Sequence, residues 1–323
     1  MTTNNLSHDE NQGSDSRWVA TSFDGLDALE FEAFNLPAPA DDEVTIRVES
    51  AGVNPIDLKI LSIVNDPKML PHPIGNEISG IVEAIGKDAQ TGTPGIKVGD
   101  EVIAYHTPGG YATRINVPAQ DVFSKPESLP FDEAAGLLLV GTTALEMVDR
   151  VGVKAGDTVL LHGASGAIGA MVLQFAKGVG ATVIGTSSAK NAENVRRFGG
   201  IPVEYGPGLA DRVRAAAPEG ITVALDAAGT EEATETSLEF VSDRNRILTV
   251  AAAPGVAEEH GFLRLGGPKS MGFRNAKRAE LIELAGAGEI QVPISHRLPL
   301  AEAKEGLDLV VNGGSAGKVI LNP

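Results

Sequence analysis

The chain has 323 residues, of which 42% are hydrophobic, so it is long enough to bury a core in each of two domains. Its formal net charge of −17 argues against nucleic acid or an anionic membrane as a partner, because both attract basic surfaces. The absence of cysteine excludes disulfides, thiolate zinc sites, iron–sulfur clusters and cysteine nucleophiles.

Residues 1–16 are polar and lack the basic and apolar regions of a signal peptide. We expect them to form a disordered tail. No apolar run approaches the length of a membrane span. Together these features predict a cytoplasmic protein.

From Arg17 to about Pro130 the pattern is one of short apolar runs broken by glycine and proline. Residues 44–48 alternate as a half-buried strand should, and further strands are expected at 78–85 and 102–105. The segment predicts a β-rich domain in the form of a partly open barrel, in which residues 44–50 make up one strand.

After Phe131 the pattern changes to alternating strands and helices. A helix is expected over 132–150, with an interruption at Gly141. Strands are expected at 158–161, 182–185, 223–226 and 246–250, and helices at 168–177, 191–198, 209–217, 231–240 and 277–287. This alternation predicts an α/β fold with a doubly wound parallel sheet. A helix near 300–311 and a strand at 318–321 end the chain.

Gly163, Gly166 and Gly169 lie between the first of these strands and its helix. In a dinucleotide site the first glycine permits the tight turn, the second lets the backbone approach a pyrophosphate, and the third lets the helix pack closely. The helix N-terminus then faces the phosphates. The motif and its context predict dinucleotide binding; a glycine turn without a ligand is the alternative.

The choice of dinucleotide depends on residues 185–191, where an NAD site usually carries an acid for the ribose hydroxyls. This segment has no acid, but it has hydroxyls and Lys190, which suit a 2′-phosphate. We therefore expect NADPH. The alternative is a surface loop in which Ser188 caps the next helix. Ligands bind at the carboxyl ends of parallel strands, so segments 163–169, 186–190, 226–229 and 250–253 should share one edge.

Several further motifs occur in a characteristic order, at residues 51–57, 75–80, 98–102, 109–112, 141–144 and 317–319. With the glycine turn, they resemble the medium-chain dehydrogenase/reductase superfamily, in its zinc-free quinone oxidoreductase branch. The resemblance implies a GroES-like β-barrel catalytic domain (17–137 and 292–323) and a Rossmann NADP-binding domain (138–291). It also implies a homodimer formed through an edge strand.

Zinc alcohol dehydrogenases of that superfamily hold their catalytic metal with Cys, His and Cys. The matching positions here are Asn54, Asn76 and Leu139, none of which is a competent zinc ligand. The segment that should hold the structural zinc lobe, 105–109, is too short for it. We therefore expect no metal.

The resemblance also implies cofactor contacts. Residues 165–168 match the turn that binds the pyrophosphate, and residues within 185–190 match the pocket for the 2′-phosphate. Single residues elsewhere match positions that contact the adenosine or the nicotinamide half. The expected set is Asn54, Thr143, Ser165, Gly166, Ala167, Ile168, Gly185, Ser187, Ser188, Lys190, Tyr205, Val250, Ala251 and Lys318. For Tyr205, an ordinary aromatic at a strand end is an equal alternative.

The expected reaction is hydride transfer from NADPH to a quinone or an α,β-unsaturated carbonyl. The oxygen that becomes negative needs a hydrogen-bond donor, and the candidates are Asn54, Tyr105 and His106. Asn54 is alternatively a turn residue before Pro55. Two other functions stay open, an enoyl-thioester reductase and a non-catalytic dinucleotide-binding sensor or structural protein. The resemblance disfavours the first, because the related enoyl-thioester reductases use a tyrosine in the segment after the Asn-Pro-x-Asp motif (residues 54–57 here), and residues 58–64 contain none.

Overall fold

The computed structural model describes residues 15–63 and 66–323. Its contacts divide the chain into two compact units. Unit 1 runs to Ser124 and also contains Leu298–Leu307 and Leu321–Pro323; unit 2 contains Lys125–Arg297 and Asp308–Ile320. No helix within the described residues is long and apolar enough to cross a membrane.

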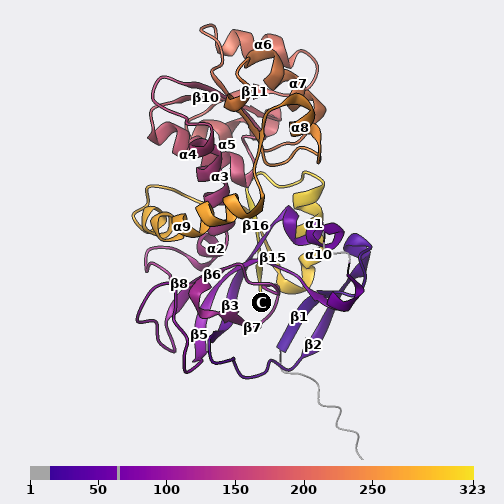
Figure 1. Cartoon of the computed structure of the whole chain (residues 1–323), viewed down its shortest axis with the longest axis vertical. Coiled ribbons are helices and arrows are strands. Elements are labelled where there is room, and N and C mark those ends of the chain that lie inside the picture. The colour runs from indigo at the N-terminus through magenta and orange to yellow at the C-terminus, as the bar shows by residue number, and fades with distance from the viewer. Residues whose placement is uncertain (1–14, 64–65) are drawn as a thin grey trace, which may run out of the picture. The chain divides into compact units, whose positions relative to one another are not determined.

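Unit 1 is built mainly from antiparallel strands, drawn from indigo to magenta in Figure 1. The strands β3, β5, β6 and β8 are neighbours in that order, and β7 pairs with the other edge of β3. A separate sheet has the order β2-β1-β4. The bounds are β1 (Asp15–Ala20), β2 (Leu29–Phe34), β3 (Glu43–Val53), α1 (Pro55–Ile63), β4 (His72–Pro73), β5 (Glu77–Ile85), β6 (Glu101–Tyr105), β7 (Arg114–Pro118) and β8 (Val122–Ser124).

The predicted strands of this unit all lie within β3, β5 and β6. Asp15 and Ser16, which we expected in the disordered tail, instead form the first two positions of β1 because they pair with Phe34 and Ala33 of β2. The rest of the predicted tail, residues 1–14, lies outside the described residues.

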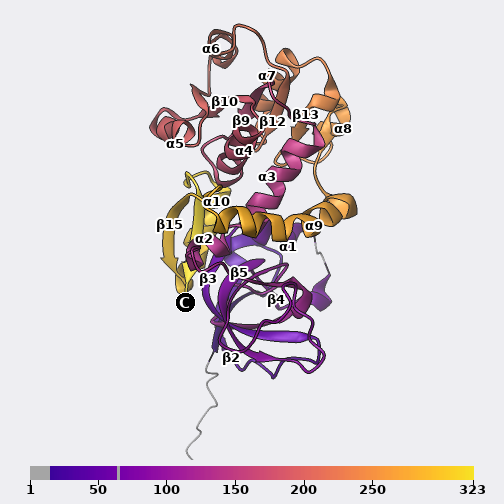
Figure 2. The ribbon, with the colours of Figure 1, turned by 90° about the vertical axis from the view of Figure 1, so that its left-hand side faces the viewer.

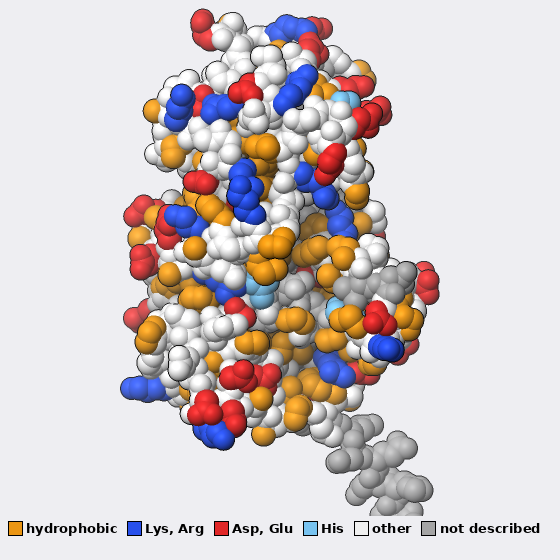
Figure 3. Space-filling view, in the orientation of Figure 1, with side chains coloured by type: hydrophobic (Ala, Val, Ile, Leu, Met, Phe, Trp, Pro, Cys, Tyr) orange, Lys and Arg blue, Asp and Glu red, His pale blue; other side chains and the backbone are white. Residues whose placement is uncertain are grey.

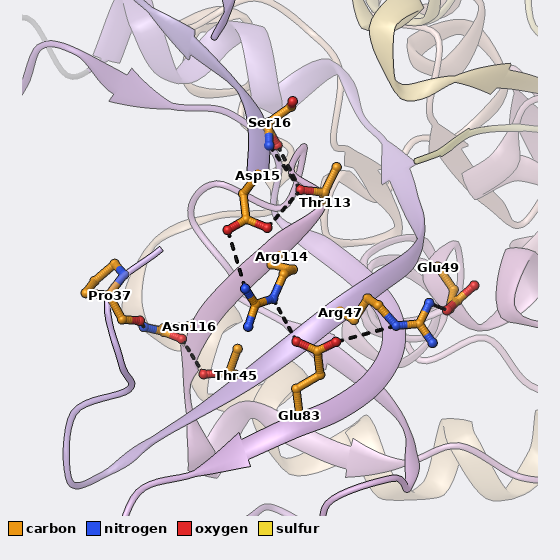
Figure 4. A network of polar contacts seen from close by, with 10 residues as sticks. All are labelled: Asp15, Ser16, Pro37, Thr45, Arg47, Glu49, Glu83, Thr113, Arg114 and Asn116. Carbon is orange, nitrogen blue, oxygen red and sulfur yellow. Dashed lines mark hydrogen bonds and ion pairs between the residues drawn. The ribbon is translucent and has the colours of Figure 1, made fainter. Parts of the chain in front are cut away.

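A polar network on unit 1 joins strands that are far apart in sequence (Figure 4). The Arg114 Nε donates to Glu83 at 2.7 Å, and its Nη1 lies 3.5 Å from Asp15. Arg47 of β3 faces the other oxygen of Glu83 at 3.6 Å. These contacts join β1, β3, β5 and β7. Because the charges are partly exposed, we expect the contacts to fix the register of the strands more than to increase the stability of the fold.

Unit 2 contains a parallel sheet with the order β11-β10-β9-β12-β13-β14. This is the order of two mononucleotide-binding halves, with a topological switch point between β9 and β12. The strands are β9 (Thr158–His162), β10 (Thr182–Ser187), β11 (Ile201–Glu204), β12 (Val223–Asp226), β13 (Ile247–Thr249) and β14 (Leu263–Arg264). The predicted doubly wound sheet is confirmed.

Helices connect and cover these strands (Figures 1 and 2). Their bounds are α2 (Phe131–Ala135), α3 (Leu138–Arg150), α4 (Ala167–Gly178), α5 (Ala192–Arg197), α6 (Leu209–Ala216), α7 (Glu231–Phe240), α8 (Val256–His260) and α9 (Gly267–Gly286). On one face of the sheet, a buried core joins the strands to α6 and α8 through Leu160, Ile184, Val203, Leu209, Val213, Ala224, Ile247 and Ala257. The chain ends with β15 (Ile294–Pro299), α10 (Ala303–Val311) and β16 (Lys318–Asn322).

Two helices differ from the sequence prediction. The break in the segment 132–150 falls between α2 and α3, at Gly136, and α3 continues through Gly141. Gly141 is there for close packing, since a Cβ would lie 3.3 Å from Leu281 of α9. Helix α9 begins at Gly267, ten residues before the predicted start, and Pro268 lies in its first turn, where proline is tolerated.

The glycine-rich segment around Phe262 contains short regular elements. Leu263 lies in the short strand β14, and Met271 lies in the first turns of α9. Residues 256–260 form a helix, α8, that the sequence pattern did not indicate. These elements are short or glycine-rich, so pairing with β13 and packing on α3 decide their conformation.

Candidate functional site

The glycine turn of unit 2 begins where β9 ends. Gly163 has a φ of +74°, a conformation that a residue with a side chain adopts only with strain. Its N–H donates to the Thr186 hydroxyl at 3.3 Å, and the Ala164 N–H donates to the Thr186 carbonyl at 3.0 Å. The turn is therefore fixed to the end of β10, the neighbouring strand.

Helix α4 starts directly after this turn, with Gly166 as its N-cap residue. A Cβ on Gly169 would lie 2.3 Å from the Gly163 carbonyl oxygen, so the helix approaches the turn more closely than a side chain permits. Within the described residues no side chain caps this helix. Its first N–H groups and the positive end of its dipole are thus available to an anion beside Ser165, Gly166, Ala167 and Ile168, which are partly exposed.

The end of β10 carries the residues expected to bind a 2′-phosphate. The Ser187 hydroxyl donates to the Ser188 carbonyl at 3.2 Å. The Ser188 hydroxyl is buried and has no hydrogen-bond partner among the described residues. It does not cap the following 3₁₀ turn, so the alternative that we considered for Ser188 is wrong. Lys190 is exposed in that turn.

Gly185 and Tyr205 lie near this loop in different environments. Gly185 is buried in β10, where a Cβ would lie 2.6 Å from Ala164 and 2.9 Å from Val195. This glycine thus lets the glycine turn and α5 pack on the strand. Tyr205 follows β11, its N–H donates to the Ser187 carbonyl at 3.3 Å, and its side chain is 54% exposed. An exposed aromatic ring beside Ser187 is available to stack on a base.

The ends of β12 and β13 are joined by Asp226 and Thr249. The Thr249 hydroxyl donates to Asp226 Oδ2 at 2.7 Å. Both side chains also accept backbone N–H groups from the loops that follow their strands. Val250 and Ala251, expected beside the nicotinamide, belong to the second of these loops and are partly exposed.

His162, the last residue of β9, is 2% exposed. Burial lowers the pKa of His162 to about 4, although the nearby Asp226 and Glu232 carboxylates act in the opposite direction. Its Nε2 has no hydrogen-bond partner in the described parts of the chain. The imidazole is therefore neutral at pH 7, directly before the glycine turn.

Unit 1 contains the candidate donors. Asn54 is 1% exposed, and its side-chain amide donates to Glu77 at 2.9 Å and to the Gly52 carbonyl at 3.2 Å. Both amide hydrogens are therefore engaged. The Asn54 backbone N–H donates to Asp57 at 2.9 Å, as in the turn that we considered as the alternative.

Asp57 is the centre of a buried network that the sequence did not predict. It is 0% exposed and accepts from the Tyr111 hydroxyl at 2.7 Å and from the Asn76 amide at 2.5 Å. Burial, followed by the negative charge of Asp57, raises the pKa of Tyr111 well above its usual value. The only sequence signal was the Asn-Pro-x-Asp motif, which did not indicate these partners.

Tyr105 and His106 lie at the end of β6. Their rings stack with centroids 4.0 Å apart, and Tyr105 pairs with Glu77 of β5. His106 has a φ of +65°, which is uncommon for a residue other than glycine. Tyr105 is 4% exposed, and His106 is more accessible.

Thr143 and Lys318 are both buried in unit 2. The Thr143 hydroxyl donates to the Leu139 carbonyl one helical turn earlier in α3, at 2.6 Å. Lys318 is 1% exposed, and its backbone N–H donates to the Pro293 carbonyl at 2.6 Å. Its side chain passes Gly136, where a Cβ would lie 2.9 Å from the lysine Cγ.

Of the three positions that match zinc ligands in the superfamily, two hold amides that are engaged in hydrogen bonds and the third holds a leucine. Asn54 and Asn76 belong to the Asp57 network, and Leu139 lies in α3. Across the described residues, no group of three or more His, Cys, Asp or Glu side chains is arranged to hold a metal ion.

Comparisons with known proteins agree with this architecture. Residues 40–127 match the family described as alcohol dehydrogenase GroES-like domain, and residues 167–289 match the family described as zinc-binding dehydrogenase. The chain is 29% identical over 303 residues to a quinone oxidoreductase from Sus scrofa, which covers 88% of this chain and 91% of the relative. It is 27% identical over 321 residues to one from Salmonella typhimurium (93% and 97%).

The solved structures include the Escherichia coli quinone oxidoreductase complexed with NADPH. Its structure superposes on this chain with a TM-score of 0.83 at 25% identity, over 95% of this chain and 100% of the other.

Proposed function

The chain belongs to the medium-chain dehydrogenase/reductase superfamily, in its zinc-free quinone oxidoreductase-like branch, and from that membership we propose an NADPH-dependent reductase of quinones or α,β-unsaturated carbonyls. The observation that carries the choice of cofactor is the buried Ser188 hydroxyl, which has no hydrogen-bond partner in the part of the chain that the structure describes. It lies in a loop that contains Lys190 and no acid from 185 to 191. A 2′-phosphate supplies the acceptor that such a hydroxyl requires.

The residues of unit 2 fit such a cofactor. The uncapped N-terminus of α4 offers backbone N–H groups to a pyrophosphate, and the close approach at Gly169 leaves that end of the helix directly over the turn. We propose that residues 165–168 bind the pyrophosphate and that Ser187, Ser188 and Lys190 bind the 2′-phosphate. Tyr205 would cover the adenosine, and Val250 and Ala251 would lie beside the nicotinamide.

When bound, NADPH supplies a hydride, and the protein supplies position and electrostatics. Reduction of a quinone places negative charge on an oxygen, which a hydrogen-bond donor stabilises and a proton then neutralises. We propose Asn54, Tyr105 and His106 as donors in unit 1. Asn54 would first have to release one of its two acceptors. Thr143 and Lys318 are proposed to act near the nicotinamide half.

We propose a small, uncharged quinone or enone as the substrate, which the net negative charge of the chain does not repel. On the face shown in Figure 3, Lys and Arg side chains are scattered among Asp and Glu.

We propose a cytoplasmic homodimer whose catalytic domain comprises 17–137 and 292–323 and whose dinucleotide domain comprises 138–291. Light scattering during gel filtration tests the dimer, and cell fractionation tests the location.

The test of the activity is NADPH oxidation, followed by absorbance, with a panel of quinones, enones and enoyl-thioesters and with NADH in parallel. We expect turnover of quinones or enones, with NADPH preferred over NADH. Turnover of enoyl-thioesters alone would show a different substrate class. Tight NADPH binding without turnover of any acceptor would contradict an enzyme and favour a sensor.

A further inference from the structure

We propose that Asp226 and Thr249 are positioning residues that hold the loops 227–229 and 250–253 in the shape required by the nicotinamide half of the cofactor. The inference rests on the proposed function, because it concerns NADPH bound at the carboxyl edge of the parallel sheet. Neither side chain is expected to touch the reacting atoms.

The first step concerns Asp226, which ends β12 and is 4% exposed. Its Oδ1 accepts the backbone N–H groups of Ala228 at 2.8 Å and Gly229 at 2.9 Å. One carboxylate oxygen therefore fixes two of the three residues of the loop that follows β12. A carboxyl side chain suits this position, since both of its oxygens accept hydrogen bonds here.

The second step concerns Thr249, the last residue of β13, which is 1% exposed. Its hydroxyl donates to Asp226 Oδ2 at 2.7 Å, which leaves the oxygen lone pairs free to accept. They accept the N–H groups of Ala251 at 3.1 Å and Ala252 at 2.9 Å. The direction of the Thr249 hydrogen bond thus couples the second loop to the first.

The third step is that the glycine turn contacts the first loop and that the first loop contacts the second. A Cβ on Gly163 would lie 3.1 Å from the Ala227 carbonyl, so the glycine turn packs against the first loop. A Cβ on Gly229 would lie 2.5 Å from the Ala251 carbonyl oxygen, so the first loop packs against the second. A displacement of one loop therefore changes its contacts with the next.

The fourth step places the pair relative to the cofactor. The sheet order puts β9, β10 and β11 in one mononucleotide-binding half and β12, β13 and β14 in the other. Because the proposed 2′-phosphate pocket follows β10, the adenosine belongs to the first half. The nicotinamide then belongs to the second half, whose loops Asp226 and Thr249 hold.

The consequence is that a change at Thr249 should affect the binding of the nicotinamide half and the adenosine half of the cofactor differently. Removing the Thr249 hydroxyl leaves an Asp226 oxygen and two backbone N–H groups without their partner. The two loops then shift under the nicotinamide, whereas the end of β10 beside the adenosine keeps its own hydrogen bonds to the glycine turn. A misplacement of about 1 Å can lower a rate about 100-fold, so we expect kcat to fall about 10- to 100-fold.

The experiment uses Thr249→Val, which removes the hydroxyl at nearly constant volume, and Thr249→Ser, which keeps it. Three quantities are measured in the full-length protein: kcat with the best acceptor, the Kd of NADPH, and the Kd of adenosine 2′,5′-bisphosphate, which carries only the adenosine end. We expect Thr249→Val to lower kcat and weaken NADPH, with unchanged binding of the bisphosphate. Thr249→Ser should restore both properties.

Thr222→Val is the matched control. Thr222 directly precedes β12, at the amino ends of the parallel strands. Its hydroxyl makes a similar bond, donating to Asp157 at 2.8 Å. We expect it to lower stability while kcat stays unchanged. If Thr249→Val does not fold, Asp226→Asn tests the same bonds, because its amide nitrogen cannot accept them.

The proposal is overturned if Thr249→Val and Asp226→Asn keep the kcat and NADPH affinity of the wild type. It is also overturned if they weaken adenosine 2′,5′-bisphosphate as much as NADPH, or if Thr249→Ser fails like Thr249→Val. Absence of turnover in the wild type would instead contradict the proposed function. The comparison of the two Kd values would still decide the positioning role in that case.

Discussion

Glu146 of α3 and Arg274 of α9 form an ion pair whose Nε–Oε2 distance is 2.9 Å, and the carboxylate is fully buried. Glu146 also accepts from Ser270 at 2.6 Å and from Arg150 at 2.5 Å. Ser270 in turn accepts the Gly266 N–H at 2.9 Å, directly before α9. One buried acid of α3 thus fixes the start of the long helix α9, which packs on α3 (Figure 2).

Glu146→Gln should destabilise the protein, because two guanidinium groups lose their counter-charge next to a buried amide. A buried pair that loses one partner typically costs more than 3 kcal/mol, but these arginines keep some solvent contact, so we expect about 2 kcal/mol. Urea denaturation measures the effect. Glu280→Gln, which breaks an exposed pair with Lys277, should change stability by less than about 0.5 kcal/mol. Equal effects of the two substitutions would contradict the anchoring role of Glu146.

Gly169→Ala should abolish NADPH binding, because the added Cβ would lie 2.3 Å from a backbone oxygen of the glycine turn. The helix would have to move away from the turn that it shapes. Gly178→Ala at the other end of α4 is the control, since a Cβ there meets nothing within 4 Å. Fluorescence titration with NADPH compares the two variants. Wild-type affinity in Gly169→Ala would contradict the assigned turn.

Lys190→Ala should weaken NADPH but leave NADH unchanged, because only NADPH carries the 2′-phosphate. A hydrogen bond to a charged group is worth about 1.5–3 kcal/mol, so the preference for NADPH should fall about 10- to 100-fold. The measurement is kcat/KM with each cofactor. Lys177→Ala, at the exposed end of α4, should leave the preference intact. A parallel loss with NADH would show that Lys190 does not read the phosphate.

His162 should make stability depend on pH between about 6.5 and 4. The unfolded chain binds a proton at a pKa near 6.5, whereas burial lowers the folded pKa to about 4. Protonation therefore favours unfolding as the pH falls through this window, by about 3 kcal/mol in total, and the stability is complete above pH 6.5. Urea denaturation at several pH values measures the slope.

His162→Gln removes this titration, so its stability should fall less than that of the wild type as the pH decreases from 6.5 to 4. His260→Gln, at an exposed position, should keep the wild-type slope. Identical slopes in the wild type and in His162→Gln would show that His162 is not the group responsible.

Much of the fold was predictable because local patterns and tertiary packing agree. The strands at 158–161 and 223–226 are continuous apolar runs, as expected for a parallel sheet covered on both faces, and both lie where predicted. The start of α9 was not predictable, because its first turns contain Gly267, Pro268 and Gly272 and owe their helical form to contacts with α3.

The sequence by itself determined the family motifs, the order of the strands and helices in unit 2, the glycine turn and the loop without an acid. These features depend on residue type at short spacing, where backbone freedom, periodicity and charge act locally. The tertiary structure alone decided which distant side chains meet. Asp57 with Tyr111, Glu146 with Arg274 and Asp226 with Thr249 are separated by 54, 128 and 23 residues. A buried polar group takes the partner that the folded sheets and helices bring to it, and no local pattern records that partner.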